Sequence, residues 1–515
     1  MNPPRITSRI LTSSIAGLIA AASVFAPSAP SRAATIYWDG TGTLWSAAAS
    51  WSSASGSTTP DQLPVAADIA QFNISLVNTA QTVSLNANQS IAGLIFSSTG
   101  TTLLQGGGTN RVLTLGTSGI VVNSTAGAPT IGSATAGQNV AITMSGAQSW
   151  TNNSTSSLLS ILNGVTNGGF LLTSGGAGST TIAGVIVGAG GITKTGAGIL
   201  TLSGVSTYTG TTTVSAGIVR ATTSTGALGA GALSLGSGTL QLANDTGLNF
   251  GRATTVTANT TVVSDRLVAG AGVTHTLGTL TIGAQTLSVT RGALATSGTG
   301  AITFGVTTMT GASTFDPQAN ATLTLGSVHG GAFGITKTGA GTLVLSGAST
   351  HTGDTTVASG ALQINNNTGA GNGTIFVSAA APAANRVLAS GGVTIFNPIS
   401  FGNTVGTAGL GVIQQTGTGQ ATFAGPITIT GAPSAGGHFV GSNTVGNELV
   451  IAGAINSTVS LSHRAGRIVY KGGGTVTVAG TPTLTITDTA IVGATNGIPT
   501  ALTPFLGGSG NATLV

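Results

Sequence analysis

Hydrophobic and polar positions alternate along short segments of this chain. In Ile199 to Leu202 and its near-copy Thr342 to Leu345, both leucines are kept while the residues between them change. A period of two, with one constant face and one variable face, is typical of β-strands packed on one side. Glycines separate these segments, as expected at turns. No segment after residue 33 shows a sustained apolar stripe of period 3.6, so the sequence predicts strands and turns with almost no helix.

An internal repeat is the clearest long-range pattern. The segment from Gly191 to Gly217 returns as Gly334 to Gly360, and 20 of the 27 positions are identical. We place three copies of the repeat, the last of them degenerate, at 188–220, 331–363 and 451–490.

The lysines follow the same repeat. The chain has only three, Lys194, Lys337 and Lys471, and each falls at the same point of a copy. Because each lysine stands between a strand and a glycine turn, we expect all three side chains to be exposed at the edge of a rung.

Self-similar units of short strands favour a solenoid, in which successive rungs stack in register. We therefore predict an all-β protein with a parallel β-helix (a β-solenoid) over residues 76–515, built from rungs of roughly 20–25 residues. A β-sandwich array or a propeller is the alternative. A propeller needs a constant blade period, whereas the lysines are 143 and then 134 residues apart.

The repeat resembles the passenger-associated, autotransporter-associated β-strand repeat of bacterial autotransporters. The resemblance rests on the lysines, on spaced glycines and on one aromatic position: Gly191, Lys194, Gly196, Gly198, Gly204, Tyr208 and Gly210 in the first copy, Gly334, Lys337, Gly339, Gly341, Gly347, His351 and Gly353 in the second, and Lys471 in the third. The copies depart from the family pattern at Ser206 and Ser349, where asparagine is usual, and at His351, which replaces the tyrosine.

This resemblance implies a right-handed β-helical passenger, secreted or held at the cell surface or outer membrane of a Gram-negative-type bacterium. It implies no chemistry. Passengers of this kind are followed by a membrane β-barrel, whose aromatic girdles are not evident here, because Tyr470 is the only Tyr or Trp after Tyr208. We expect a membrane β-barrel, further passenger or a partner chain to cover the C-terminal end.

The first 33 residues have a different character. Two arginines precede an apolar stretch from Ile10 to Phe25, and small residues flank Arg32. This order is typical of a helical secretory signal peptide, here 1–33, cleaved after Ala33 or Ala34. The alternative is a membrane anchor, but a spanning helix needs about 20 apolar residues and this stretch is shorter.

The composition excludes several classes of protein. Charged residues make up 4% of the chain and cysteine is absent, so there are no disulfides and no thiol chemistry. Without the signal peptide the chain has 11 basic and 9 acidic residues. A nearly neutral chain lacks the clustered Lys and Arg of a nucleic-acid-binding protein.

Residues 34–75 are rich in tryptophan. Trp38, Trp45 and Trp51 fall close together at the start of the expected solenoid. We interpret them as a cap that covers the open end of the core. The alternative is an aromatic platform on which sugar rings stack.

Candidate catalytic residues are sparse. No two acidic residues lie within five positions of each other, and several occupy turn contexts, although stacked rungs can still bring distant ones together. We expect Asp265 and Arg266 to form a solvated surface pair. The five histidines lack ligand spacing, and Thr193 and Thr336 stand where a phosphate-binding loop needs glycine. We predict no catalytic residues, no metal and no cofactor.

The sequence therefore predicts a non-catalytic exported β-solenoid passenger with a structural or adhesin-like role. A surface glycan or a surface protein is the expected ligand. The alternative is a β-helical carbohydrate-active enzyme, a polysaccharide lyase or glycoside hydrolase. Convergence of three or more acids on one lateral groove would favour the enzyme.

Overall fold

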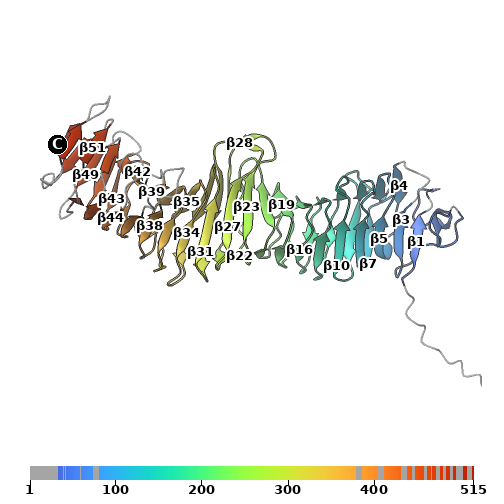
Figure 1. The fold of residues 1–515 in the computed structure, drawn as a ribbon. Coiled ribbons are helices and arrows are strands. Elements are labelled where there is room, and N and C mark those ends of the chain that lie inside the picture. Colours follow the sequence, from blue (N-terminus) through green and yellow to red (C-terminus); the bar gives the residue numbers. More distant parts are fainter. Residues whose placement is uncertain are drawn as a thin grey trace, which may run out of the picture.

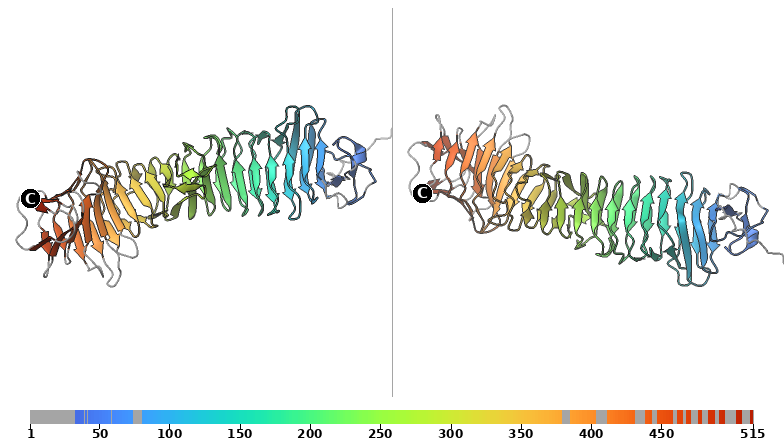
Figure 2. Two further views of the ribbon diagram at one scale, coloured as in Figure 1. Left: turned by 90° about the horizontal axis from the view of Figure 1, so that it is seen from above. Right: turned by 90° about the horizontal axis from the view of Figure 1, so that it is seen from below.

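The chain folds into a long rod of stacked rungs (Figures 1 and 2). The computed structural model describes residues 33–38, 40, 42–57, 59–73, 80–378, 385–402, 411–430, 438–442, 447–457, 461–464, 467–470, 476–478, 483–487, 491–494, 503–506 and 513–514. Within these ranges the secondary structure is strand, apart from a single turn of 3-10 helix, η1 (Ala48–Ser50). None of the described helical structure is long and apolar enough to cross a membrane. The expected signal peptide, 1–33, lies almost wholly outside the described residues.

The first sheet begins at the N-terminal end of the rod. It is parallel except for one antiparallel pair, β1 with β2. Its strands are β1 (Thr35–Trp38), β2 (Trp51–Ser52), β3 (Ile69–Phe72), β5 (Gln89–Phe96), β7 (Arg111–Val122), β9 (Val140–Met144), β10 (Gln148–Asn152), β12 (Val165–Thr166), β13 (Leu172–Gly175), β15 (Ile186–Val187), β16 (Ile192–Lys194), β18 (Thr212–Val214), β20 (Leu233–Leu235), β22 (Thr254–Val256), β26 (Leu280–Ile282), β30 (Thr307–Met309) and β33 (Val328–His329).

The first sheet divides at the long strand β7. The start of β7 pairs with β9, and its end pairs with β10. We call the branch β9, β12 and β15 the side ladder, because it runs beside the branch that continues through β10, β13 and β16.

The second sheet runs along the rod as one parallel ladder. Its strands are β4 (Gln81–Ser84), β6 (Thr102–Gln105), β8 (Pro129–Ile131), β11 (Leu159–Ile161), β14 (Thr180–Ile182), β17 (Ile199–Leu202), β19 (Ile218–Thr222), β21 (Thr239–Ala243), β23 (Thr260–Asp265), β27 (Thr286–Arg291), β31 (Ser313–Pro317), β34 (Ile335–Lys337), β36 (Thr355–Val357), β38 (Ile375–Ser378), β41 (Ile399–Gly402), β44 (Ile427–Thr430), β47 (Ile455–Ser457) and β50 (Val476–Val478).

Two further parallel sheets belong to the C-terminal half. The third sheet contains β25 (Thr274–Thr276), β29 (Gly300–Phe304), β32 (Ala321–Leu325), β35 (Thr342–Leu345), β37 (Ala361–Ile364), β39 (Asn385–Ser390), β42 (Gly411–Thr416), β45 (His438–Ser442), β48 (Leu461–Arg464), β51 (Thr483–Thr487) and β53 (Thr503–Leu506). The fourth contains β40 (Thr394–Ile395), β43 (Gln420–Phe423), β46 (Glu448–Ile451), β49 (Arg467–Tyr470), β52 (Ile491–Ala494) and β54 (Thr513–Leu514). A pair of short strands, β24 (Gly270–Ala271) and β28 (Ala295–Ser297), forms a lateral protrusion (Figure 1).

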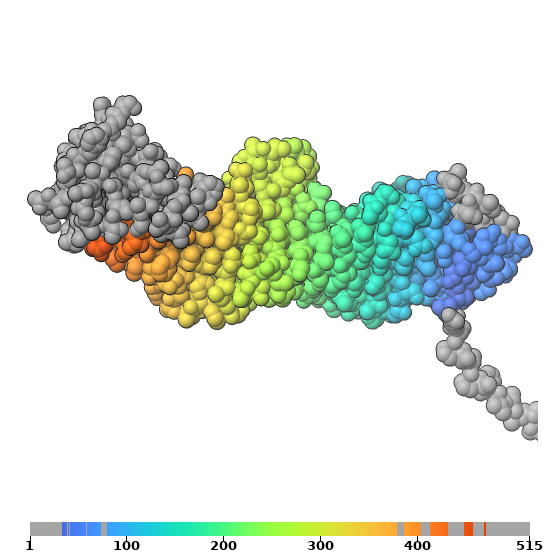
Figure 3. Space-filling model, in the orientation of Figure 1, coloured from blue at the N-terminus to red at the C-terminus, as the bar shows by residue number. Residues whose placement is uncertain are grey.

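The number of strands per rung changes along the rod. Rungs carry three strands up to β17, two from β18 to β21, three again from β22 to β35, two at β36 and β37, and three beyond. Figure 3 shows the rod narrowing near residue 210, where the first two-stranded rungs lie. The register between neighbouring rungs advances by 20 residues at the first repeat and by 27 between β26 and β30.

Inward-facing side chains stack in columns and fill the core. In the second sheet Leu200, Val219, Leu240 and Val262 succeed one another in register, and all are fully buried. Leu200 and Leu202 face inward while Ile199 and Thr201 are partly exposed. The period-two prediction and the parallel β-solenoid are thereby confirmed.

Candidate functional site

Each close copy of the repeat starts with a lysine inside the core. In β16, Ile192 and Lys194 are buried and Thr193 between them is not. Lys194 stands in an inward column between Ser174 and Val214. It is 1% exposed, and Lys337, at the same place in β34, is 0% exposed. The expected rung-edge exposure is therefore wrong: the lysine is the last residue of its strand, and strand alternation puts its side chain on the same face as the isoleucine.

Backbone carbonyl groups surround the buried ammonium. Lys337 Nζ donates hydrogen bonds to the carbonyl oxygens of Thr338 (2.5 Å), Gly339 (2.8 Å) and Ser359 (2.9 Å). Two of these carbonyls belong to the turn after β34, and the third belongs to the next rung. Lys194 Nζ donates to the carbonyl oxygen of Gly196. We call this arrangement the carbonyl cradle. A buried ammonium is tolerated when its protons are hydrogen-bonded in this way.

The next rung leaves room for the ammonium by using glycine. Gly217 and Gly360 adopt φ values of 63° and 73°, in the left-handed region. A Cβ atom at either position would stand 2.9 Å from the lysine Nζ. Both the backbone conformation and the space therefore require glycine.

Burial changes the acidity of both lysines. Desolvation lowers the pKa of Lys194 to about 8. It also lowers the pKa of Lys337 to about 8, although the charge of nearby Asp316 opposes the change. Both ammonium groups remain mostly protonated at neutral pH, where the carbonyl oxygens stabilise the charge.

A third cradle holds glutamine instead of lysine. Gln415 is 0% exposed, and its Nε2 donates to the carbonyl oxygens of Thr416 (3.0 Å), Gly417 (3.0 Å) and Gly419 (3.2 Å). The segment from Ile413 to Gly419 matches the start of the repeat with Gln in the lysine position. Sequence reasoning searched for lysine and missed this copy, although the Thr-Gly-x-Gly turn signals it. Lys471, in the copy placed at 451–490, lies outside the described residues.

An aromatic ring follows each lysine at the third corner of the rung. Tyr208 and His351 are both fully buried. Tyr208 Oη is 2.6 Å from Thr212 Oγ1, and the two hydroxyl groups share a hydrogen bond. The equivalent hydroxyl beside His351, on Thr355, has no hydrogen-bond partner among the described residues. The shorter imidazole leaves the tyrosine's hydrogen bond unmade.

These rings stand where a strand ladder ends. The side ladder finishes at β15, and the carbonyl of Ile186 accepts hydrogen bonds from the backbone N–H of Thr207 (2.9 Å) and Tyr208 (3.2 Å). The first sheet finishes at β33, and the carbonyl of Val328 accepts one from Thr350 N–H (2.9 Å). In both places the next rung has only two strands.

The glutamine copy provides a contrast. Fourteen residues after Gln415, the position that corresponds to Tyr208 is Ile429, which lies in β44. There the second sheet continues to β47. A repeat with the ring is followed by the end of a ladder, and a repeat without it is not. The ring and its flanking amides therefore close an exposed sheet edge.

The remaining repeat glycines allow rungs to approach closely. An added Cβ would stand within 2.6 Å of a backbone atom of a neighbouring rung at every one of them: Gly191, Gly196, Gly198, Gly204, Gly210, Gly334, Gly339, Gly341, Gly347 and Gly353. Sequence reasoning missed a further pair, Gly229 and Gly371. At these two positions a Cβ would stand 2.7 Å from the ring of Tyr208 or His351.

The N-terminal tryptophans pack against one another. Trp38, Trp45 and Trp51 are at most 2% exposed. The Trp38 and Trp51 rings meet edge to face at 5.0 Å between centroids, and the Trp45 and Trp51 rings at 4.9 Å. Their faces are used inside the core, so the sugar-stacking interpretation is wrong for these residues. Their position favours the cap.

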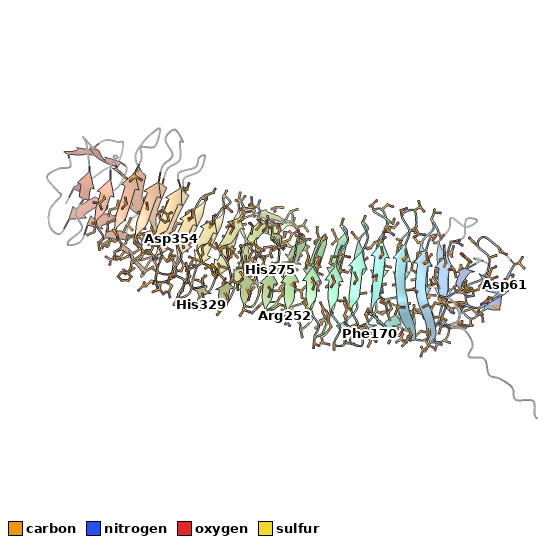
Figure 4. All side chains as sticks on the ribbon, turned by 60° about the horizontal axis from the view of Figure 1, so that its bottom comes forward. Asp61, Phe170, Arg252, His275, His329 and Asp354 are labelled. Carbon is orange, nitrogen blue, oxygen red and sulfur yellow. The ribbon has the colours of Figure 1, made fainter. Side chains whose placement is uncertain are left out.

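The acidic side chains brace loops. Asp245 Oδ1 accepts hydrogen bonds from the backbone N–H groups of Leu267 and Val268, both at 3.0 Å. Figure 4 shows Asp61, His275 and Asp354 spread along the rod. In the part of the chain that the structure describes, no three His, Asp or Glu side chains come together as a metal site.

The expected surface pair of Asp265 and Arg266 is also wrong. Asp265 is 3% exposed and accepts hydrogen bonds from Gln241 Nε2 (2.7 Å) and from the backbone N–H of Leu294 (3.0 Å). Arg266 instead pairs with Asp245 at 3.5 Å. The carboxylate turns inward to anchor the base of the protrusion, because backbone N–H groups there need an acceptor.

Comparison with known families agrees with this architecture. The molecule is a parallel β-solenoid whose close repeats carry a buried lysine and a buried ring. Two segments, 192–221 and 335–364, match the passenger-associated-transport-repeat family. The chain thus carries the repeat of autotransporter passengers, and the resemblance of the sequence is confirmed. No curated protein and no solved structure matched the chain.

Proposed function

We propose that this protein is an exported passenger that acts as a non-catalytic rod, displayed at the outer membrane or released from the cell surface. The observation that carries the proposal is the pair of passenger-associated-transport repeats on a parallel β-solenoid. The second sheet stacks 18 strands. At about 4.8 Å between strands the rod is on the order of 80 Å long, enough to hold a ligand-binding surface away from a membrane.

Localisation tests the export. The full-length chain with an internal epitope in the protrusion between β24 and β28 is expressed in a Gram-negative host that supplies an autotransporter barrel. We expect the epitope outside the cell, either in the medium or accessible to added protease. A control that lacks residues 1–33 should remain inside. Retention of the full-length chain in the cytoplasm would contradict the proposal.

The adhesin-like role needs a separate measurement. The rod is expected to bind a surface glycan or a surface protein, with no bond made or broken. Purified 34–515 is therefore tested for binding to host cells, to glycan arrays and to polysaccharides. Saturable binding without release of oligosaccharides supports the role. Release of new reducing ends would show an enzyme, and absence of all binding would reduce the role to that of a spacer.

A further inference from the structure

A nearly buried carboxylate faces the first ordered backbone amide of the chain. Asp68 is 5% exposed. Its Oδ1 accepts a hydrogen bond from the backbone N–H of Ala34 (3.2 Å), and its Oδ2 accepts one from Val65 N–H (3.0 Å). Neither donor carries a charge in the uncleaved chain.

No countercharge is present beside this carboxylate. In the described part of the chain the sole ion pair joins Arg266 to Asp245, so no lysine, arginine or histidine pairs with Asp68. A carboxylate held out of water without a cation is unfavourable, because its hydration is lost and little replaces it. A cation placed at the nitrogen of Ala34 would remove that cost.

We propose that processing at the Ala33–Ala34 bond creates this cation, and that the new N-terminal ammonium of Ala34 is the partner of Asp68. The proposal rests on the proposed export. Water adds across the peptide bond, the carboxylate stays on Ala33, and the amine released on Ala34 takes up a proton. The hydrolysis is catalysed by a signal peptidase of the exporting cell. The amide nitrogen already 3.2 Å from Asp68 Oδ1 becomes the ammonium nitrogen.

The structure also separates the two bonds that the sequence left open. Ala33 is exposed, whereas Ala34 is half-buried and packs against the core. The carbonyl of Ala34 accepts a hydrogen bond from Ile69 N–H (2.8 Å), which continues the pairing of β1 with β3. Cleavage after Ala34 would remove both this bond and the donor to Asp68. Cleavage after Ala33 keeps the bond and strengthens the donor.

Mapping the terminus is the first test. The precursor is exported as above, and the N-terminus of the external protein is determined by sequencing and intact mass. Ala34 as first residue supports the proposal. A terminus at Thr35 or elsewhere on an exported protein overturns it while the proposed function stands. Failure of export counts against the proposed function instead, and the second test then decides this inference by itself.

The second test measures the coupling between the two charges. Mature 34–515 is prepared with a free and with an acetylated N-terminus, each with Asp68 and with Asp68→Asn. Hydrogen exchange of β1 is the readout. A charge-assisted hydrogen bond of this kind should make acetylation lower the protection of β1 about tenfold with Asp68 and hardly at all with Asn. Equal effects of acetylation in both backgrounds would overturn the proposal.

A third preparation covers the case in which Asp68→Asn does not fold at its N-terminus. Mature protein that begins at Ala33 retains Asp68 and a free amine but moves the charge by one residue. We expect lower protection of β1 in this protein than in the one that begins at Ala34. Equal protection would show that the position of the ammonium is irrelevant and would refute the pairing.

Discussion

Replacement of Lys337 tests whether the carbonyl cradle stabilises the rod. Lys337→Ala removes three buried methylene groups, worth about 0.8 kcal/mol each, and the donor to three carbonyl oxygens, worth at least about 1 kcal/mol each. Removal of the ammonium recovers part of its desolvation cost, on the order of 1–2 kcal/mol after allowance for the carbonyl contacts. The net expected loss is about 3 kcal/mol.

Two further variants separate the methylene stem from the ammonium. Lys337→Gln should cost less than about 1 kcal/mol, because Gln415 fills a cradle of the same kind with hydrogen bonds of 3.0 to 3.2 Å. Lys337→Met keeps the stem and loses the donor, so it should fall between the other two. Thr336→Ala is the matched control on the partly exposed face of the same strand and should stay within about 0.5 kcal/mol of the parent.

A local readout is required because a solenoid does not unfold as one unit. Hydrogen exchange is followed in the rungs from β31 to β37 at several urea concentrations. A loss of about 3 kcal/mol corresponds to a fall in protection of about a hundredfold. If the Ala and Gln variants behave alike, and both match Thr336→Ala, the cradle contributes nothing and the reasoning is refuted.

Three other predictions concern the same elements. The unfolding free energy should rise between pH 8 and 10, since the lysine pKa values lie near 8 in the fold and at 10.5 ordinarily, and fall above pH 10, since burial raises the pKa of Tyr208 to about 12; urea titrations from pH 7 to 12 that show no rise would contradict this. His351→Tyr should stabilise the second copy by about 1 kcal/mol by giving the Thr355 hydroxyl a partner, and the thermal midpoint of the double variant with Thr355→Val should lose that gain. Gly360→Ala should cost at least about 2 kcal/mol in urea melts, because a Cβ meets both a strained φ and Lys337 Nζ, and Lys337→Gln should relieve only the second part.

The sequence was sufficient for the local structure and for the class of fold. Alternation in Ile199 to Leu202 and the repeat glycines predicted inward and outward faces that the structure confirms. The lysines were misplaced because a charged residue before a glycine turn is usually exposed, and the carbonyl cradle that permits burial comes from two rungs. No local pattern reveals a contact between residues 22 positions apart. The inward carboxylate of Asp265 was missed for the same reason.

The two close copies of the repeat do not lie on the same sheets. Lys194 belongs to the first sheet and Lys337 to the second, while the leucine strands that follow them belong to the second and the third. Each ladder that ends at a buried ring passes its role to the neighbouring sheet, so the repeat shifts by one face around the rod axis between its copies. Two identical outer surfaces are therefore not presented as a linear array. A bivalent partner that recognised the outer threonines of one copy would have to reach around the rod to engage the other, which restricts avidity to flexible or encircling ligands.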